Sequence, residues 1–152
     1  MKTLVSTTLI ALTFISLGAC STSSNEAIRT ISNSPVGVGS TKEIVGKAVR
    51  TSLTARLWII ESETDNSTIA SITSDGGRMA KVMVTYTADN FSIERLDSHH
   101  FGYNEKRNQI SARYNRWITN IEHDIMIRTG ISPEVANTHV YKARAATAAA
   151  SK

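Results

Sequence analysis

One stretch near residue 120 constrains the fold more than any other part of the chain. Its apolar residues recur at spacings of three and four, so on a helical wheel they form one stripe about 100° wide. They are Ile110, Tyr114, Trp117, Ile118, Ile121 and Ile125. The pattern predicts an amphipathic helix over 108–128, capped by Asn108 and ended by Gly130. Such a helix gains most of its stability from another layer packed on its apolar face.

That second layer is predicted between residues 57 and 96, where short apolar runs alternate with turn residues. The candidate strands are 57–60, 67–73, 78–86 and 91–96, separated by Asp65-Asn66, Asp75-Gly76-Gly77 and Ala88-Asp89-Asn90. Turns this short join antiparallel neighbours. The spacing therefore predicts a four-stranded antiparallel meander.

A further helical pattern over 42–55 precedes the strands, with Thr41 or Ser40 as its cap. We therefore expect an α+β fold of two layers, in which both helices pack on one face of the meander in the order α-β-β-β-β-α. This domain spans 42–128, and residues 129–152 form a C-terminal helical tail that frays at its end.

The second face of the meander has two interpretations. It carries Met79, Met83 and possibly Trp58 among polar side chains. Either it is exposed and suited to contact with a partner, or the segment 131–145 folds over it. Both interpretations stay open at this point.

The first twenty residues have the pattern of an export signal. After Met1-Lys2, residues 4–17 are apolar and uncharged; as a helix they span about 21 Å, short of a hydrocarbon core of about 30 Å. Leu17-Gly18-Ala19-Cys20 then resembles the lipobox of bacterial lipoprotein precursors, and Cys20 is the chain's only cysteine. The alternatives are a plain signal peptide that leaves Cys20 as a free thiol, and a cytosolic protein with a buried cysteine.

The lipobox resemblance implies that residues 1–19 are removed and that Cys20 carries acyl chains. Two or more chains anchor a protein stably in a bilayer. Ser21 favours the outer membrane by resemblance to enterobacterial sorting, with the inner membrane as the alternative. Residues 20–41 are rich in Ser, Thr, Asn and Gly and are predicted to be a flexible tether with a reach of about 25 Å, unless Ile28 and Ile31 belong to a short ordered arm.

The long helix also carries a motif. Tyr114-Asn115-Arg116-Trp117-Ile118-Thr119-Asn120-Ile121, followed by Asp124-Ile125, resembles the YN-x-W-I-x-N-I helix of a group of small uncharacterised proteobacterial lipoproteins. The strand segments 82–86 and 91–95 fit the same pattern, except that Arg95 stands where an aromatic residue is expected. The resemblance implies a fold and a location in the envelope, and it implies no reaction.

Few residues form a pattern typical of catalysis or metal binding. Asp97, His99 and His100 are the most site-like group, but adjacent histidines in an extended segment point apart, and His123 and His139 are remote in sequence. No nucleophile or zinc motif occurs. We therefore expect no metal, no cofactor and no enzyme, with a hydrolase or small-ligand binder that uses the loop 97–103 as the alternative.

The charge pattern excludes nucleic acid as a partner. The chain of 152 residues has a formal net charge of +4, and its longest basic run is Lys106-Arg107. A polar border flanks the apolar stripe of the long helix, and it either ties the helix to a strand end or binds a partner. Its residues are Arg113, Trp117, Asn120 and Asp124. The sequence thus predicts a lipid-anchored, periplasm-facing module that binds another envelope protein.

Overall fold

Residues 25–149 are described by a computed structural model, which contains seven strands and three helices in that range. The N-terminal part consists of β1 (Asn25–Ala27), β2 (Ile31–Pro35) and α1 (Lys42–Ala55). The central strands are β3 (Ile59–Glu63), β4 (Ser67–Thr73), β5 (Met79–Tyr86) and β6 (Asn90–His99). The C-terminal part consists of β7 (Gln109–Ser111), α2 (Ala112–Arg128) and α3 (Pro133–Ala149). The signal peptide, the lipobox and Cys20 lie outside the described residues.

The main sheet is antiparallel throughout and has the order β2-β6-β5-β4-β3. The predicted α+β class and the meander of β3 to β6 are therefore confirmed, but the predicted number of four strands is wrong. The fifth strand, β2, comes from the segment 20–41 that was predicted to be a tether. It is ordered because Ile31 and Ser34 are buried, at 5% and 2% exposure, where β2 pairs with β6. The alternative of an ordered arm that includes Ile31 is the correct one.

A second, two-stranded sheet pairs β1 with β7 and changes the predicted start of the long helix. Ile110 was expected in the first helical turn, but it lies in β7 opposite Glu26 and is fully buried. The helix α2 begins at Ala112, and its cap is Ser111, whose side chain accepts from the Arg113 N–H at 3.3 Å. Asn108, the predicted cap, has a φ of 50° in the preceding turn. Three residues of extended pairing thus replace the first predicted turn of helix.

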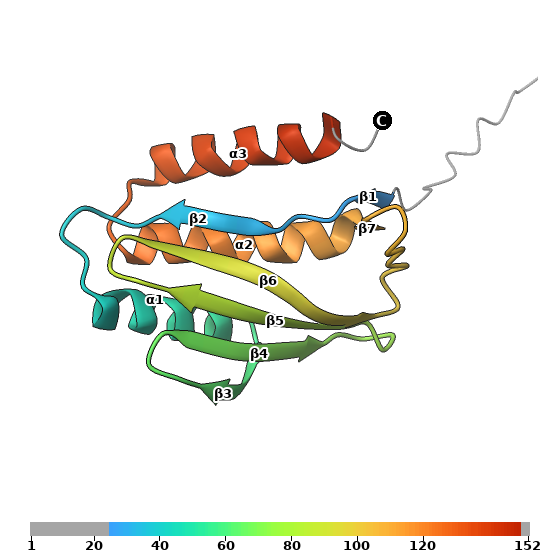
Figure 1. The fold of residues 1–152 in the computed structure, drawn as a ribbon, viewed down its shortest axis with the longest axis horizontal. Helices are drawn as coiled ribbons and strands as arrows, with labels where there is room; N and C mark the ends of the chain where they lie inside the picture. The colour runs from blue at the N-terminus through green and yellow to red at the C-terminus, as the bar shows by residue number, and fades with distance from the viewer. Residues whose placement is uncertain (1–24, 150–152) are drawn as a thin grey trace, which may run out of the picture.

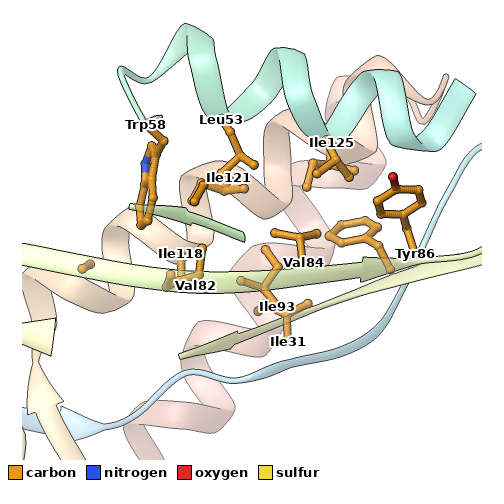
Figure 2. Packing of buried hydrophobic residues seen from close by; sticks show 14 of the residues in the cluster. Ile31, Leu53, Trp58, Val82, Val84, Tyr86, Ile93, Ile118, Ile121 and Ile125 are labelled. Carbon is orange, nitrogen blue, oxygen red and sulfur yellow. The ribbon is translucent and has the colours of Figure 1, made fainter. Parts of the chain in front are cut away.

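Helices α1 and α2 cover one face of the main sheet, as predicted (Figure 1). Side chains from both helices meet those of β5 and β6 in a continuous core (Figure 2). The apolar stripe of α2 is buried, with Trp117 partly exposed at its border. Gly46 of α1 permits a close approach, since a Cβ there would lie 2.9 Å from the Tyr86 ring. The largest apolar side chains that are almost completely buried are those of Leu53, Phe91, Ile93, Phe101, Ile110, Tyr114, Ile118, Ile121, Ile125 and Met126.

The opposite face of the main sheet carries Met79, Lys81, Met83 and Thr85, all partly exposed. The interpretation that residues 131–145 cover this face is wrong, because α3 packs against α2 and beside β1 (Figure 1). Trp58, which was considered for the same face, is instead 4% exposed in the core.

Helix α3 extends the core beyond the predicted boundary at residue 128. Ala136 and Val140 are buried members of the hydrophobic cluster. The predicted domain 42–128 is therefore too short at both ends, since Ile31 and Val140 belong to the same core. Within residues 25–149, none of the helices combines the length and the apolar character that crossing a bilayer requires.

A buried ion pair holds the N-terminal segment against α2 and α3. Arg29 donates through Nη2 to Glu122 Oε2 and through Nη1 to the Val140 carbonyl, at 3.5 Å in the second case. The other carboxylate oxygen of Glu122 accepts from the Ser34 hydroxyl at 3.1 Å and lies 3.3 Å from His139 Nε2. Both charged side chains are 2% exposed. Hydrogen bonds to protein groups therefore take the place of the water that both charges lose on burial, and a buried ion pair is tolerated only when it has such partners.

Candidate functional site

The reversal between α1 and β3 holds an exposed leucine in a conformation that favours glycine. The N–H of Trp58 donates to the Leu53 carbonyl and that of Leu57 to the Thr54 carbonyl, both at 3.0 Å. This is the Schellman pattern, in which the residue after the cap takes a left-handed conformation. Leu57 is that residue, with a φ of 63° and an exposure of 81%. The conformation costs a non-glycine residue about 1 kcal/mol, and Leu57 gains little burial in return.

Leu57 stands beside a hollow of about 300 Å³, which we call the corner hollow. The helices α1 and α2 and the strand β4 supply its walls. It is lined by Ala55, Arg56, Leu57, Trp58, Ile72, Trp117 and Asn120. Ile59, two residues after Leu57, is 69% exposed on the edge strand β3. Exposed aliphatic groups next to an aromatic-walled hollow are typical of a surface that contacts a protein partner.

The floor of the corner hollow is fixed by packed aromatic rings. Trp117 meets Trp58 edge to face at a centroid distance of 6.3 Å and meets Phe101 in the same manner at 5.0 Å. Phe101 also packs against Tyr114 at 5.7 Å, and burial raises the pKa of the Tyr114 phenol above its usual range. Edge-to-face pairs are favourable and directional. The indole of Trp117 is therefore held in a fixed orientation.

The predicted polar border is divided by the structure between two roles. Asp124 accepts two hydrogen bonds from Arg56, at 2.6 Å from Nε and 3.0 Å from Nη2. It thus ties α2 to the end of α1, whereas a tie to a strand end was expected. Trp117 and Asn120 line the corner hollow, while Arg113 is exposed and does not line it.

The histidine-rich loop does not gather ligands. His99 lies 3.2 Å from Asp97, and both side chains are about half exposed. His100 is exposed and has a φ of 58°. His123 lies beside Asp124 at 3.7 Å, and His139 faces Glu122. Among residues 25–149, no three His, Cys, Asp or Glu side chains converge as a metal site requires.

Sequence reasoning identified two of the seven residues that line the corner hollow. Trp117 and Asn120 follow from the helical wheel, because they stand at the border of the apolar stripe. Leu57 was assigned to a strand that begins at residue 57, whereas β3 begins at Ile59. The available signal was the absence of glycine after the helix 42–55, so that a non-glycine residue takes the left-handed position there.

Comparisons with other proteins give no relative from which an activity can be transferred. A scan of the chain against protein-family models finds no match, and searches of curated proteins and of solved structures also find no similar protein.

Proposed function

We propose that this chain is a bacterial envelope lipoprotein, anchored through acyl chains on Cys20, whose folded part binds another envelope protein without catalysing a reaction. Two features support the proposal. The lipobox-like Leu17-Gly18-Ala19-Cys20 supports the anchor. The observation that carries the binding role is Leu57, an exposed leucine kept in a left-handed conformation beside the corner hollow. Strain that burial does not offset is a common mark of a functional position.

The anchor and the fold are close together in the chain. The first strand that the structure describes, β1, begins at Asn25, so five residue steps separate it from Cys20, at most about 18 Å of extended chain. The folded part would therefore stand next to the membrane surface. Ser21 favours the periplasmic face of the outer membrane, with the inner membrane as the alternative.

The partner would present an aliphatic or aromatic side chain to the corner hollow. Its walls offer Trp58 and Trp117, and its rim offers the polar groups of Arg56 and Asn120. Tryptophan and arginine are the residue types that dominate the energy of protein interfaces. Leu57 would then regain the burial that it lacks in the free protein.

The anchor is tested by fractionation of cells that express Cys20→Ala. We expect the wild-type chain in the membrane pellet with a mass that includes the acyl groups, and the variant unprocessed at its N-terminus. Ser21→Asp is the matched control because it keeps the thiol of Cys20. It is expected to change which membrane the protein resides in and to leave the acylation of Cys20 unchanged. A wild-type chain with an unmodified thiol would refute the anchor.

The binding surface is tested by Leu57→Gly. Glycine adopts the left-handed conformation without strain, so we expect this variant to be at least as stable as the wild type. A photoreactive residue at position 59 is expected to give one discrete cross-linked product in cells, and Leu57→Gly should remove it. Val38→Asn is the control, since Val38 is also fully exposed in a loop but does not line the hollow. Equal cross-linking in both variants would refute the role of the corner hollow.

A further inference from the structure

A second hollow, of about 480 Å³, lies where β1, the start of α2 and the end of α3 meet, and we call it the basic hollow. Figure 1 shows these three segments at the same end of the molecule. Its lining combines arginines of α2, of α3 and of the connection between β1 and β2 with small apolar residues. The lining residues are Glu26, Arg29, Ala112, Asn115, Arg116, Tyr141, Arg144, Ala145, Thr147 and Ala148.

The basic hollow has an excess of positive charge. Arg116 and Arg144 both line it, and neither forms an ion pair with another residue of the range 25–149. Glu26 is the one carboxylate among the lining residues within 25–149, and its Oε2 already accepts from Asn115 Nδ2 at 3.2 Å. Two guanidinium groups beside one hollow repel each other until an anion bridges them.

Arg29 adds an independent observation. Its side chain is 2% exposed, and two of its nitrogens are used by Glu122 and Val140. Its Nε is buried and has no hydrogen-bond partner in the structure. A buried N–H without an acceptor is costly, and Arg29 is one of the residues that line the hollow. Arg29 thus joins Arg116 and Arg144 in the lining, and one of its donors is unused.

The start of α2 also favours an anion in the basic hollow. Ala112, the first residue of α2, lines the basic hollow. The first N–H groups of a helix have no intrahelical acceptor and carry the positive end of the helix dipole. The Ser111 side chain accepts from the Arg113 N–H at 3.3 Å.

We propose that the basic hollow binds the phosphate-bearing headgroup of an anionic phospholipid in the membrane that holds Cys20. Guanidinium pairs match the oxygens of a phosphate diester. The choice of a lipid as the source rests on the proposed anchor, because six residue steps separate Cys20 from Glu26, at most about 21 Å. An anchored protein meets headgroups at a high effective concentration, whereas free phosphate must be captured from solution.

Neighbouring residues fit a membrane-facing end. Lys106 and Arg107 are exposed in the turn between Asn104 and Gln109, which leads directly into β7 beside β1. Basic residues near an anionic surface each strengthen its binding. Tyr141, which is 74% exposed, lines the basic hollow with an amphipathic ring of the kind enriched at membrane interfaces.

The test titrates the full chain, as purified in a non-ionic detergent, with soluble short-chain lipids. Phosphatidylglycerol, phosphatidylcholine and inorganic phosphate are added separately, and the arginine Nε–H signals are followed by NMR. We expect phosphatidylglycerol to bind more tightly than the other two ligands, and Arg116→Gln with Arg144→Gln to weaken it by about tenfold or more. Arg113→Gln is the matched control, because Arg113 is exposed in the same turn outside the hollow, and its affinity should stay within about twofold of wild type.

Several results would overturn the proposal. Equal affinity for inorganic phosphate would assign the hollow to free anions, and an equal loss in Arg113→Gln would indicate only diffuse charge. No response to any ligand would refute the site itself. Thermal unfolding of the double variant should match the wild type, since both arginines are exposed and neither forms an ion pair within residues 25–149. The mass of the same sample reports acylation of Cys20, so failure of the anchor is distinguished from failure of the hollow.

Discussion

Removing one member of the buried pair Arg29–Glu122 should destabilise the protein strongly. Both side chains are 2% exposed, so Arg29→Met leaves a carboxylate in the interior without its cation. Breaking a buried pair in this way costs about 3–5 kcal/mol. The Ser34 hydroxyl, at 3.1 Å, and His139, at 3.3 Å, remain beside Glu122. We therefore expect a value near the lower end, about 3 kcal/mol, against a total stability of about 5–15 kcal/mol.

The double variant Arg29→Met with Glu122→Leu separates the cost of a broken pair from the value of the pair. It removes both charges and restores apolar volume, so it should be more stable than Arg29→Met alone. The assay is urea unfolding of a chain that begins at Ser21, followed by the fluorescence of Trp58 and Trp117.

Arg50→Met is the control for this comparison. Its partner Glu63 lies 3.6 Å away, and the two side chains are 45% and 37% exposed. Exposed pairs contribute little, so the loss should be below about 1 kcal/mol. The reasoning is refuted if Arg29→Met and Arg50→Met cost the same, or if the double variant is the least stable of the set.

Two further predictions concern the glycine loop and the open sheet face. Gly37→Ala should destabilise the fold by about 1–3 kcal/mol, because the new Cβ would lie 1.9 Å from the Thr129 carbonyl oxygen; thermal unfolding measures this, and the loss of Tm should be absent in Val38→Ala. Lys81→Met should raise the pKa of Glu61, which the hydrogen bond from Lys81 lowers in the wild type. The lowered pKa of Glu61 stabilises the wild-type fold at pH values above about 4.3, the carboxyl pKa of the unfolded chain, and this stabilisation is lost as the pH falls through the pKa of the folded state. Because Lys81→Met lacks this contribution, its stability should fall less over the same acidic pH range. An unchanged carboxyl titration by NMR would contradict it.

The sheet region shows how far local pattern is sufficient. The alternation of apolar and polar residues over 78–86 predicted which side of β5 faces the helices. The turn Asp75-Gly76-Gly77 predicted the hairpin that joins β4 to β5. The helix 42–55 was predicted with its observed bounds. In each case the hydrophobic period and the turn residues lie within the element itself, so no distant partner is needed to interpret them.

The N-terminal segment shows where local pattern fails. Residues 25–41 have the composition of a linker, yet Arg29, Ile31 and Ser34 are buried. Their partners lie far along the chain. Asn115 accepts a hydrogen bond from the Arg29 backbone N–H, and Glu122 accepts one from the Arg29 guanidinium. In the sequence, an arginine that will be buried in a polar segment cannot be distinguished from a solvated one until the carboxylate that pairs with it is known.

The sequence by itself determined the two amphipathic helices, the meander of β3 to β6, and the lipobox-like start that supports a membrane anchor. Only the tertiary structure decided that β1 and β2 join the fold, that α3 packs beside β1, and that three arginines surround one hollow. The physical reason is the range of the interactions. Hydrophobic periodicity and turns act over a few residues, whereas strand pairing at a sheet edge, buried ion pairs and convergent charges depend on contacts between segments that are far apart in the chain.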